Sequence, residues 1–182
     1  MKIASKRLIL RPFTLNDVDN VDRYSKKESV TTFMVWGPNT FEQTENFVKH
    51  VVYQSRLKPQ LEHHFMVQLK EGPVIGACSL TFDNLNEPPA LGWLFDDLYW
   101  NQGYGTEVAK ALLSYAFNTL KVRQVYATCQ EENIGSARVM EKNGMRYVKT
   151  ISKEYPKLGK VMVRIYEITA LEYRLNNHKT FI

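Results

Sequence analysis

The sequence predicts one domain of the α/β or α+β class, spanning residues 1–182. The first observation is that short apolar runs typical of strands are interleaved with segments whose apolar residues recur at helical spacing. The second is that no internal repeat, low-complexity tract or linker interrupts the 182 residues. A chain of this length can bury one substantial hydrophobic core, so a single layered domain is expected.

The first half of the chain predicts two helices and three strands. Arg7–Arg11 alternates basic and apolar residues, as a strand with one buried face does. Helices are expected to begin after Thr14 and Thr40, because an acid or amide three residues after each hydroxyl is typical of a capping box. Two further strands, 64–69 and 74–82, flank a Gly-Pro turn. The second of them is apolar enough to be central.

The second half alternates strands and helices and ends in an antiparallel pair. The apolar strand Leu91–Phe95 leads through a loop with two glycines into a helix. Gly144 ends the next helix, as a left-handed C-cap does. The other expected elements are a strand at Gln124–Cys129, the closing pair Met145–Ile151 and Lys160–Ile168, and a short or frayed helix at Leu171–Leu175.

The composition indicates a cytoplasmic protein that does not contact a membrane. Hydrophobic residues make up 44% and charged residues 24% of the chain, which is ordinary for a soluble domain. No run approaches the ~18 apolar residues of a membrane span, and the N-terminus lacks the apolar core of a secretory signal. Cys78 and Cys129 lie in strand-like runs without metal-site spacing, so we expect buried free thiols and no metal.

The net charge of +5 is spread along the chain. No dense basic block or aromatic-basic interleaving is present, so direct contact with nucleic acid is not expected. Two interpretations remain. One is an ordinary solvated, mildly basic surface, and the other is attraction to a polyanionic ligand or to a surface like that of a ribosome.

The stretch Trp93–Glu107 predicts an anion site. A strand, a turn and a helix N-terminus bring unpaired first-turn N–H groups and the positive end of a helix dipole to one point. Gly103 and Gly105 lack a Cβ, so the backbone can approach a phosphate closely and adopt positive φ. Val108 replaces the third glycine of a dinucleotide motif, and no lysine makes a nucleoside-triphosphate loop. A structural turn without a ligand is the alternative.

Asn133–Met145 is the second informative stretch. Asn133 follows a strand and precedes a helix, so taken alone it reads as an N-cap. The stretch repeats the order strand, polar turn and helix about thirty residues after the first one. This repetition favours a shared ligand.

Together the two stretches resemble the GNAT acyl-CoA N-acyltransferases. The first is similar to the family's pyrophosphate loop, written Q/R-x-x-G-x-G/A, and the second to its N-x-x-[AS]…G-[FM] helix and following strand. The opening Arg7–Pro12 and the run Tyr99–Glu107 are similar to the RimJ/RimL-type subgroup, which acetylates protein N-termini, including ribosomal ones. The resemblance covers the chain from Ser5 to about Tyr173.

The resemblance implies a fold and a co-substrate. The fold is a mixed, mostly antiparallel, twisted sheet of about seven strands, with helices on both faces and a splay at the central strands. The co-substrate is acetyl-CoA, and no metal is implied. The backbone of Trp93, Leu94 and Phe95 would pair with the pantetheine arm, and one of these N–H groups would polarise the thioester oxygen. Asn133 would bond the same arm. The N–H groups that would hold the pyrophosphate are those of Asn101, Gln102, Gly103, Tyr104, Gly105 and Thr106.

Catalytic residues follow from the same resemblance. A serine at the position of Ser136 and a glutamate at that of Glu154 are implicated in the subgroup. Glu154 would accept the amine proton, directly or through water, and Ser136 would bond the departing sulfur. A small residue at a helix start and a charge at a strand edge are the structural alternatives. Met140 stands where many relatives place a tyrosine general acid, and Asn101 replaces a usual glycine.

The predicted function is acetyl-CoA-dependent N-acetylation of a primary amine, most simply the α-amine of a protein or peptide. The alternatives are a small amine such as a polyamine or aminoglycoside, and a non-catalytic acyl-CoA-binding module. A homodimer is an open alternative for its assembly. A polyamine would need an acidic patch, for which Asp96, Asp97 and Glu87 are the candidates.

Four residues are candidates for the acceptor side. Of His63 and His64 at most one faces the cleft, since adjacent strand residues point to opposite faces. Core or surface histidines are the alternative. Phe33 and Trp36 are candidates for the acceptor pocket, with core packing or a lid contact as the alternative.

Overall fold

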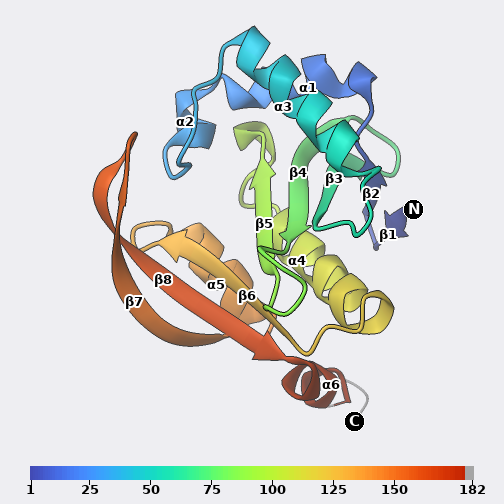
Figure 1. The fold of residues 1–182 in the computed structure, drawn as a ribbon, viewed down its shortest axis with the longest axis vertical. Helices are drawn as coiled ribbons and strands as arrows, with labels where there is room; N and C mark the ends of the chain where they lie inside the picture. Colours follow the sequence, from blue (N-terminus) through green and yellow to red (C-terminus); the bar gives the residue numbers. More distant parts are fainter. Residues whose placement is uncertain (179–182) are drawn as a thin grey trace.

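The computed structural model describes residues 1–178 and shows an open, twisted sheet with helices on both faces (Figure 1). The strand order is β1-β2-β3-β4-β5-β6-β8-β7, and every neighbouring pair is antiparallel except β5 with β6. The predicted mixed sheet is confirmed. It has one strand more than the expected seven, and the additional strand is β1, which has two residues. The strands are β1 (Ile3–Ala4), β2 (Leu8–Pro12), β3 (Glu62–Leu69), β4 (Val74–Thr81), β5 (Ala90–Phe95), β6 (Gln124–Gln130), β7 (Arg146–Tyr155) and β8 (Gly159–Thr169).

The helices bury separate clusters on the two faces of the sheet. α1 and α3 contribute Val21 and Val48 to one cluster, together with Met66 of β3. α4 and α5 contribute Leu112 and Met140 to the larger cluster on the other face. The helices are α1 (Val18–Ser25), α2 (Glu28–Thr31), α3 (Phe41–Gln54), α4 (Tyr104–Ser114), α5 (Ile134–Lys142) and α6 (Ala170–His178), with 3-10 turns at Leu15–Asp17 and Asp97–Tyr99 and a π-helical turn at Tyr115–Thr119.

The sheet splits where β5 meets β6. Their parallel pairing consists of Ala90 with Tyr126 and Leu91 with Ala127, and then the strands diverge. This is the predicted splay at the central strands. It leaves the edge of β5 beyond Leu91 without a strand partner, directly before the loop that leads into α4.

Both predicted capping boxes form. The N–H of Thr14 donates to the Asp17 carboxylate at 2.8 Å, and the N–H of Thr40 donates to the Gln43 side chain at 2.8 Å. Arg11 adds two bonds to Asp17, at 2.9 and 2.6 Å, and so ties the end of β2 to the start of α1.

The main differences from the prediction lie in polar segments. β7 extends to Tyr155, four residues beyond the expected Ile151, and β8 begins at Gly159. β7 is an edge strand with mostly exposed side chains, so no apolar alternation marks its length. The four-residue α2 was not predicted, whereas the tail is a helix, α6. Among the described residues, no helix has the length and apolar character needed to cross a bilayer.

Candidate acyl-CoA and amine site

The loop before α4 has the geometry of an anion site. Asn101 and Gly103 have φ of +59° and +79°, so left-handed residues alternate with ordinary ones and turn successive N–H groups to one side. In the described part of the chain, none of the six N–H groups from Asn101 to Thr106 meets an acceptor. Asparagine suits the position of Asn101, because among residues other than glycine it is one of those that tolerate a left-handed φ best.

Gly105 serves a different purpose from Gly103. A Cβ on Gly105 would lie 3.0 Å from Cγ2 of Val139, so the missing side chain lets α4 approach α5 closely. A Cβ on Gly103 would meet only Arg7, at 3.7 Å, so only its left-handed φ demands glycine. Of the two glycines expected to adopt positive φ, only Gly103 does so, whereas Gly105 allows the close packing of α4 on α5. Close approach of both glycines to a phosphate stays a prediction.

Arg7 braces this loop from the N-terminal strand region. Its Nη1 donates to the carbonyl of Gln102 at 3.0 Å, and its guanidinium lies 4.3 Å from the ring centre of Tyr104. Its Nε and backbone N–H donate to the two carboxylate oxygens of Glu107, at 2.7 and 2.6 Å, and Ser5 adds a bond at 2.7 Å. Two motifs that are nearly a hundred residues apart in sequence thus form one unit.

A groove of about 520 Å³ runs from this loop to β5 and α5. Its lining includes all but one of the predicted cofactor residues, namely Trp93, Leu94, Phe95, Asn101, Gly103, Tyr104, Gly105, Thr106 and Asn133. Gln102 is absent from the lining: its side chain donates to the carbonyl of Leu98 at 3.1 Å, and its own carbonyl is held by Arg7. The backbone donors at one end and an unpaired strand edge at the other fit a long anionic ligand such as acyl-CoA.

The register of β5 decides which backbone groups face the groove. The N–H of Asp96 donates to Ile75 of β4 at 2.9 Å. Antiparallel pairs alternate, so Leu94 is also turned toward β4, whereas Trp93 and Phe95 are turned toward the splay. The carbonyl of Phe95 already accepts the indole N–H of Trp100 at 2.9 Å. Trp93 therefore offers both N–H and C=O, Phe95 offers its N–H, and Leu94 contributes only its side chain.

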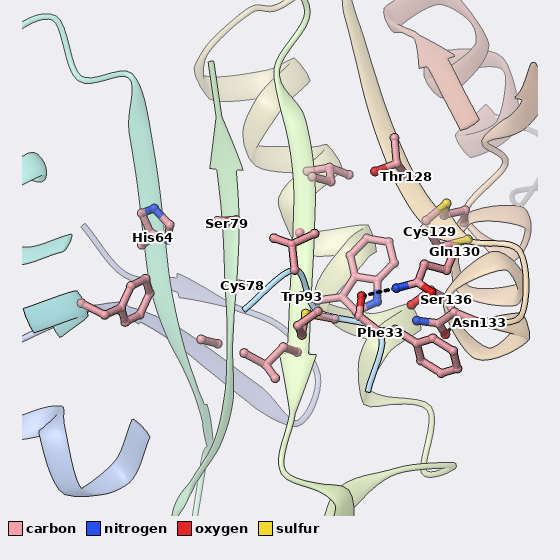
Figure 2. Close-up of a pocket in the computed structure, with 18 residues that line it drawn as sticks. Phe33, His64, Cys78, Ser79, Trp93, Thr128, Cys129, Gln130, Asn133 and Ser136 are labelled. Carbon is pink, nitrogen blue, oxygen red and sulfur yellow. Dashed lines mark hydrogen bonds between the residues drawn. The ribbon is translucent and has the colours of Figure 1, made fainter. Parts of the chain in front are cut away.

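A second cavity of about 340 Å³ meets the groove (Figure 2). Six residues line both: Phe33, Met34, Trp93, Leu94, Asn133 and Ser136. Figure 2 shows Ser136 and Asn133 at one end of this cavity and His64 at the other, beyond Ser79 of β4. We call this second space the acceptor cavity and the shared wall the junction.

The predicted catalytic residues are not brought together. Ser136 lies at the junction, where its N–H donates to Oδ1 of Asn133 at 3.0 Å, so Asn133 is an N-cap as well as a lining residue. Glu154 is exposed on β7, opposite Lys160 of β8, and lines neither space. Met140 is buried and lines the acceptor cavity, where its thioether has no acidic proton to donate.

The other acceptor-side candidates differ in where they lie. The two histidines are on opposite faces of the sheet, and Phe33 and Trp36 are in the segment after α2. His64 lines the cavity, and His63 is buried on the opposite face, 3.0 Å from the hydroxyl of Tyr115. Phe33 lines both spaces, whereas Trp36 contributes its carbonyl to a bond with Lys157. At most one histidine was expected to face the cleft, and one does.

The predicted acidic patch is neutralised. Asp96 is fully buried between Arg23 and Lys27, at 3.1 and 2.7 Å, and Asp97 bonds Lys27 at 2.7 Å. Hydrogen bonds from Lys27 and Ser29 lower the pKa of Asp97 to about 2. Asp96 and Asp97 thus anchor α1 and α2 to the sheet. Glu87 lies in the exposed loop before β5 and lines neither space.

Both cysteines are buried free thiols, as predicted, and both line the acceptor cavity. Burial raises the pKa of Cys78, and it raises the pKa of Cys129 to about 11. Because the thiolate is the nucleophile, neither thiol is activated near neutral pH. Among the described residues there is also no group of three or more His, Cys, Asp or Glu side chains that could hold a metal ion.

Several cavity residues escaped the sequence reasoning. Ser79, Thr128 and Gln130 lie in ordinary strand patterns, and nothing local distinguishes them. Gln130 also donates to the carbonyl of Phe33 at 3.1 Å (Figure 2). The strand register could have identified these residues, because they lie beside the splay and on the face of the sheet opposite α4.

Comparison with known proteins agrees with this geometry. The acetyltransferase (GNAT) domain family matches residues 7–146. The uncharacterized N-acetyltransferase YnaD of Bacillus subtilis (strain 168) is 33% identical over 158 residues, which cover 86% of this chain and 89% of YnaD. A GNAT-family acetyltransferase from Bacillus anthracis has a crystal structure with a TM-score of 0.83 and 32% identity, covering 94% of this chain and 99% of that one. The ribosomal L7/L12 α-N-protein acetyltransferase RimL in complex with CoA shares the fold at 16% identity, with a TM-score of 0.83 over 93% of this chain and 98% of that one. The chain belongs to the GNAT acetyltransferase family and is an N-acetyltransferase.

Proposed function

We propose that the protein transfers the acetyl group of acetyl-CoA to the α-amine of a peptide or protein N-terminus. One observation carries the proposal: the groove that fits acyl-CoA and the acceptor cavity share a wall at Trp93, Asn133 and Ser136. A thioester that follows the edge of β5 would reach this wall, and an amine in the cavity would approach it from the other face.

The charge of the acceptor cavity favours a peptide over a polyamine. Among the described residues that line it, none is Asp, Glu, Lys or Arg. Burying a polycation there would leave its charges uncompensated, which is costly. Structural neighbours include a spermidine N-acetyltransferase from Vibrio cholerae at 18% identity and RimL at 16%, which show the fold alone. The RimJ/RimL-type assignment therefore remains a proposal.

Residues at the junction and on the adjoining part of β5 support acyl transfer in stated roles. The free N–H of Trp93 or Phe95 is placed to donate to the thioester oxygen as it gains negative charge. The amine nitrogen forms the new C–N bond as the C–S bond breaks. The hydroxyl of Ser136 makes no hydrogen bond in the described structure and is free to donate to the departing thiolate. The ammonium proton goes to water or to Glu154, whose role stays a prediction because it lies outside both cavities.

The test is acetyl-CoA turnover against a panel of amines, detected as free CoA thiol and as acetylated product by mass. The panel contains peptides with free N-termini, the same peptides with blocked N-termini, spermidine and an aminoglycoside. We expect turnover of free peptides and none of blocked ones. Turnover of spermidine alone would refute the peptide assignment, and so would CoA binding without turnover of any peptide in the panel.

Three further predictions accompany this proposal. They are a single domain over residues 1–182, a cytoplasmic location, and a homodimer as an open alternative to the monomer. The single domain and the cytoplasmic location follow from the sequence patterns given above.

A further inference from the structure

The acceptor cavity continues past the junction and ends at a histidine. His64, Ser79 and Gly92 lie opposite one another on β3, β4 and β5, so they share one face of the sheet. A Cβ on Gly92 would lie 2.9 Å from the hydroxyl oxygen of Ser79. Glycine at this position keeps the floor open between the junction and His64. In Figure 2, Ser79 of β4 lies between His64 and the junction residues Trp93 and Ser136.

The His64 ring is held from several sides. Its Nε2 lies 3.0 Å from Oε2 of Glu62. Phe13 and Phe47 contact it edge to face, with ring centres 6.4 and 6.1 Å away and interplanar angles of 89° and 88°. The ring is therefore fixed in one orientation before any ligand arrives, which lowers the entropic cost of binding.

The contact with Glu62 determines what the other ring nitrogen can do. A carboxylate only accepts hydrogen bonds, so Nε2 carries the proton and Nδ1 of the neutral ring is an acceptor. Burial lowers the pKa of His64, with Glu62 opposing the shift, and this favours the neutral ring. In the described part of the chain, the His64 ring makes no hydrogen bond other than the one to Glu62.

We propose that His64, oriented by Glu62, is a specificity-determining subsite that accepts a hydrogen bond from an uncharged N–H or O–H donor of the amine acceptor. Neighbouring strands are about 4.8 Å apart, so His64 on β3 lies about 10 Å across the sheet from β5. That is the span of about three extended residues, so a peptide would offer an N–H from its second, third or fourth residue. The inference deepens the proposed function and rests on it.

Two substitutions of His64 distinguish the roles of its two ring nitrogens. The Asn oxygen in His64→Asn occupies nearly the position of Nδ1, whereas the Gln amide in His64→Gln reaches the position of Nε2. We expect His64→Asn to retain most activity and His64→Gln to lose about tenfold in kcat/KM, through KM rather than kcat. His50→Gln is the matched control, because His50 also contacts Glu62, at 3.5 Å, but is exposed and does not line the cavity. Melting curves confirm that each variant is folded.

The substrate side provides the complementary measurement. N-methylation of the peptide at residue 2, 3 or 4 removes one N–H at a time. At one of these positions the wild type should lose about tenfold in kcat/KM, and His64→Gln should lose nothing further. Equal losses in wild type and His64→Gln at every position would overturn the subsite.

A spectroscopic measurement tests the subsite without depending on turnover. The ¹⁵N resonance of Nδ1 of His64 should move when tetrapeptide amides with free N-termini are added to the wild-type protein with CoA. If Nδ1 responds but no peptide is acetylated, the proposed function fails and the subsite stands. If peptides are acetylated and neither Nδ1 nor kcat/KM in His64→Gln changes, the subsite fails and the function stands.

Discussion

The ammonium of Lys157 lies 2.6 Å from the carbonyl oxygen of Thr31, a residue 126 positions earlier in the chain. Lys157, in the turn between β7 and β8, also donates to the carbonyls of Trp36 and Met34, at 3.0 and 3.2 Å. An ammonium has three protons, and this arrangement uses all of them. Together with the bond from Gln130 to Phe33, it holds residues 31–36, here called the strap, over the junction.

Lys157→Met should loosen the strap, because it removes all three donors and keeps the apolar stem. Phe33 and Met34 would then be less well placed at the junction, and we expect kcat/KM for the acceptor to fall about tenfold. Amide hydrogen exchange in residues 32–37 should quicken. Lys153→Met, an exposed change on β7, is the control. Unchanged exchange in Lys157→Met would show that Gln130 suffices.

We expect Arg7→Ala to weaken CoA binding indirectly, through the loop before α4. The Arg7 side chain is 41% exposed, so its ion pair with Glu107 contributes little to stability in itself. Its contact with the Gln102 carbonyl and its stacking on Tyr104 fix the loop, and losing them should raise the Kd for CoA about five- to tenfold. Calorimetric titration measures this, with Lys6→Ala as the neighbouring control. An unchanged Kd would show that the loop before α4 keeps its conformation without the contacts of Arg7.

Substitutions at Asn101 should follow its positive φ. We expect Asn101→Gly to be neutral or stabilising, and Asn101→Val to lower the free energy of unfolding by about 1–2 kcal/mol and to weaken CoA binding. Lys121 has the same φ of +59° but does not line the groove. Lys121→Val should therefore destabilise similarly and leave CoA affinity intact. Equal CoA affinities in both valine variants would disprove the role of this backbone turn.

Ser136→Ala and Glu154→Gln test the two catalytic predictions separately. Loss of the Ser136 hydroxyl should lower kcat about tenfold or more and leave the Kd for CoA nearly unchanged, because the bond to sulfur strengthens as charge develops. If Glu154 is the general base, the Glu154→Gln substitution should lower kcat about 10²-fold or more. Full activity in Glu154→Gln would leave water as the proton acceptor, in keeping with its exposed position.

Stability should fall as the pH decreases below about 6.5. Burial is the main cause that lowers the pKa of His63 and His64 below 6.5. In this window the unfolded chain binds more protons than the folded one, so the free energy of unfolding decreases with pH down to the folded pKa values. Burial would raise the pKa of Asp17, but bonds from Arg11 and Thr14 lower it below 3.8, so its contribution is lost only in stronger acid.

Urea denaturation at pH 7.5, 6.5, 5.5 and 5.0 measures this effect. His64→Asn removes one titrating ring and should flatten the decline. An equal slope in wild type and His64→Asn would assign the effect to other groups.

Helix starts and the anion loop were predictable because they depend on neighbours within a few residues. Thr14 and Thr40 cap helices through side chains three positions away. The positive φ at Gly103 and the unpaired first-turn N–H groups follow from a glycine before a helix. The full length of β7 was missed because an exposed edge strand carries no apolar pattern, whereas β8 agrees with its expected bounds to within one residue at each end.

The sequence by itself determined the local elements, the two strand-turn-helix units and the family they resemble. Only the tertiary structure decided that His64 rather than His63 faces the acceptor cavity, since that depends on which face α4 covers. It also decided that Asp96 is a buried anchor, that Gly105 serves helix packing, and that Lys157 holds the strap. These contacts join residues far apart in the chain, and the register across the splayed sheet, which no local preference encodes, brings them together.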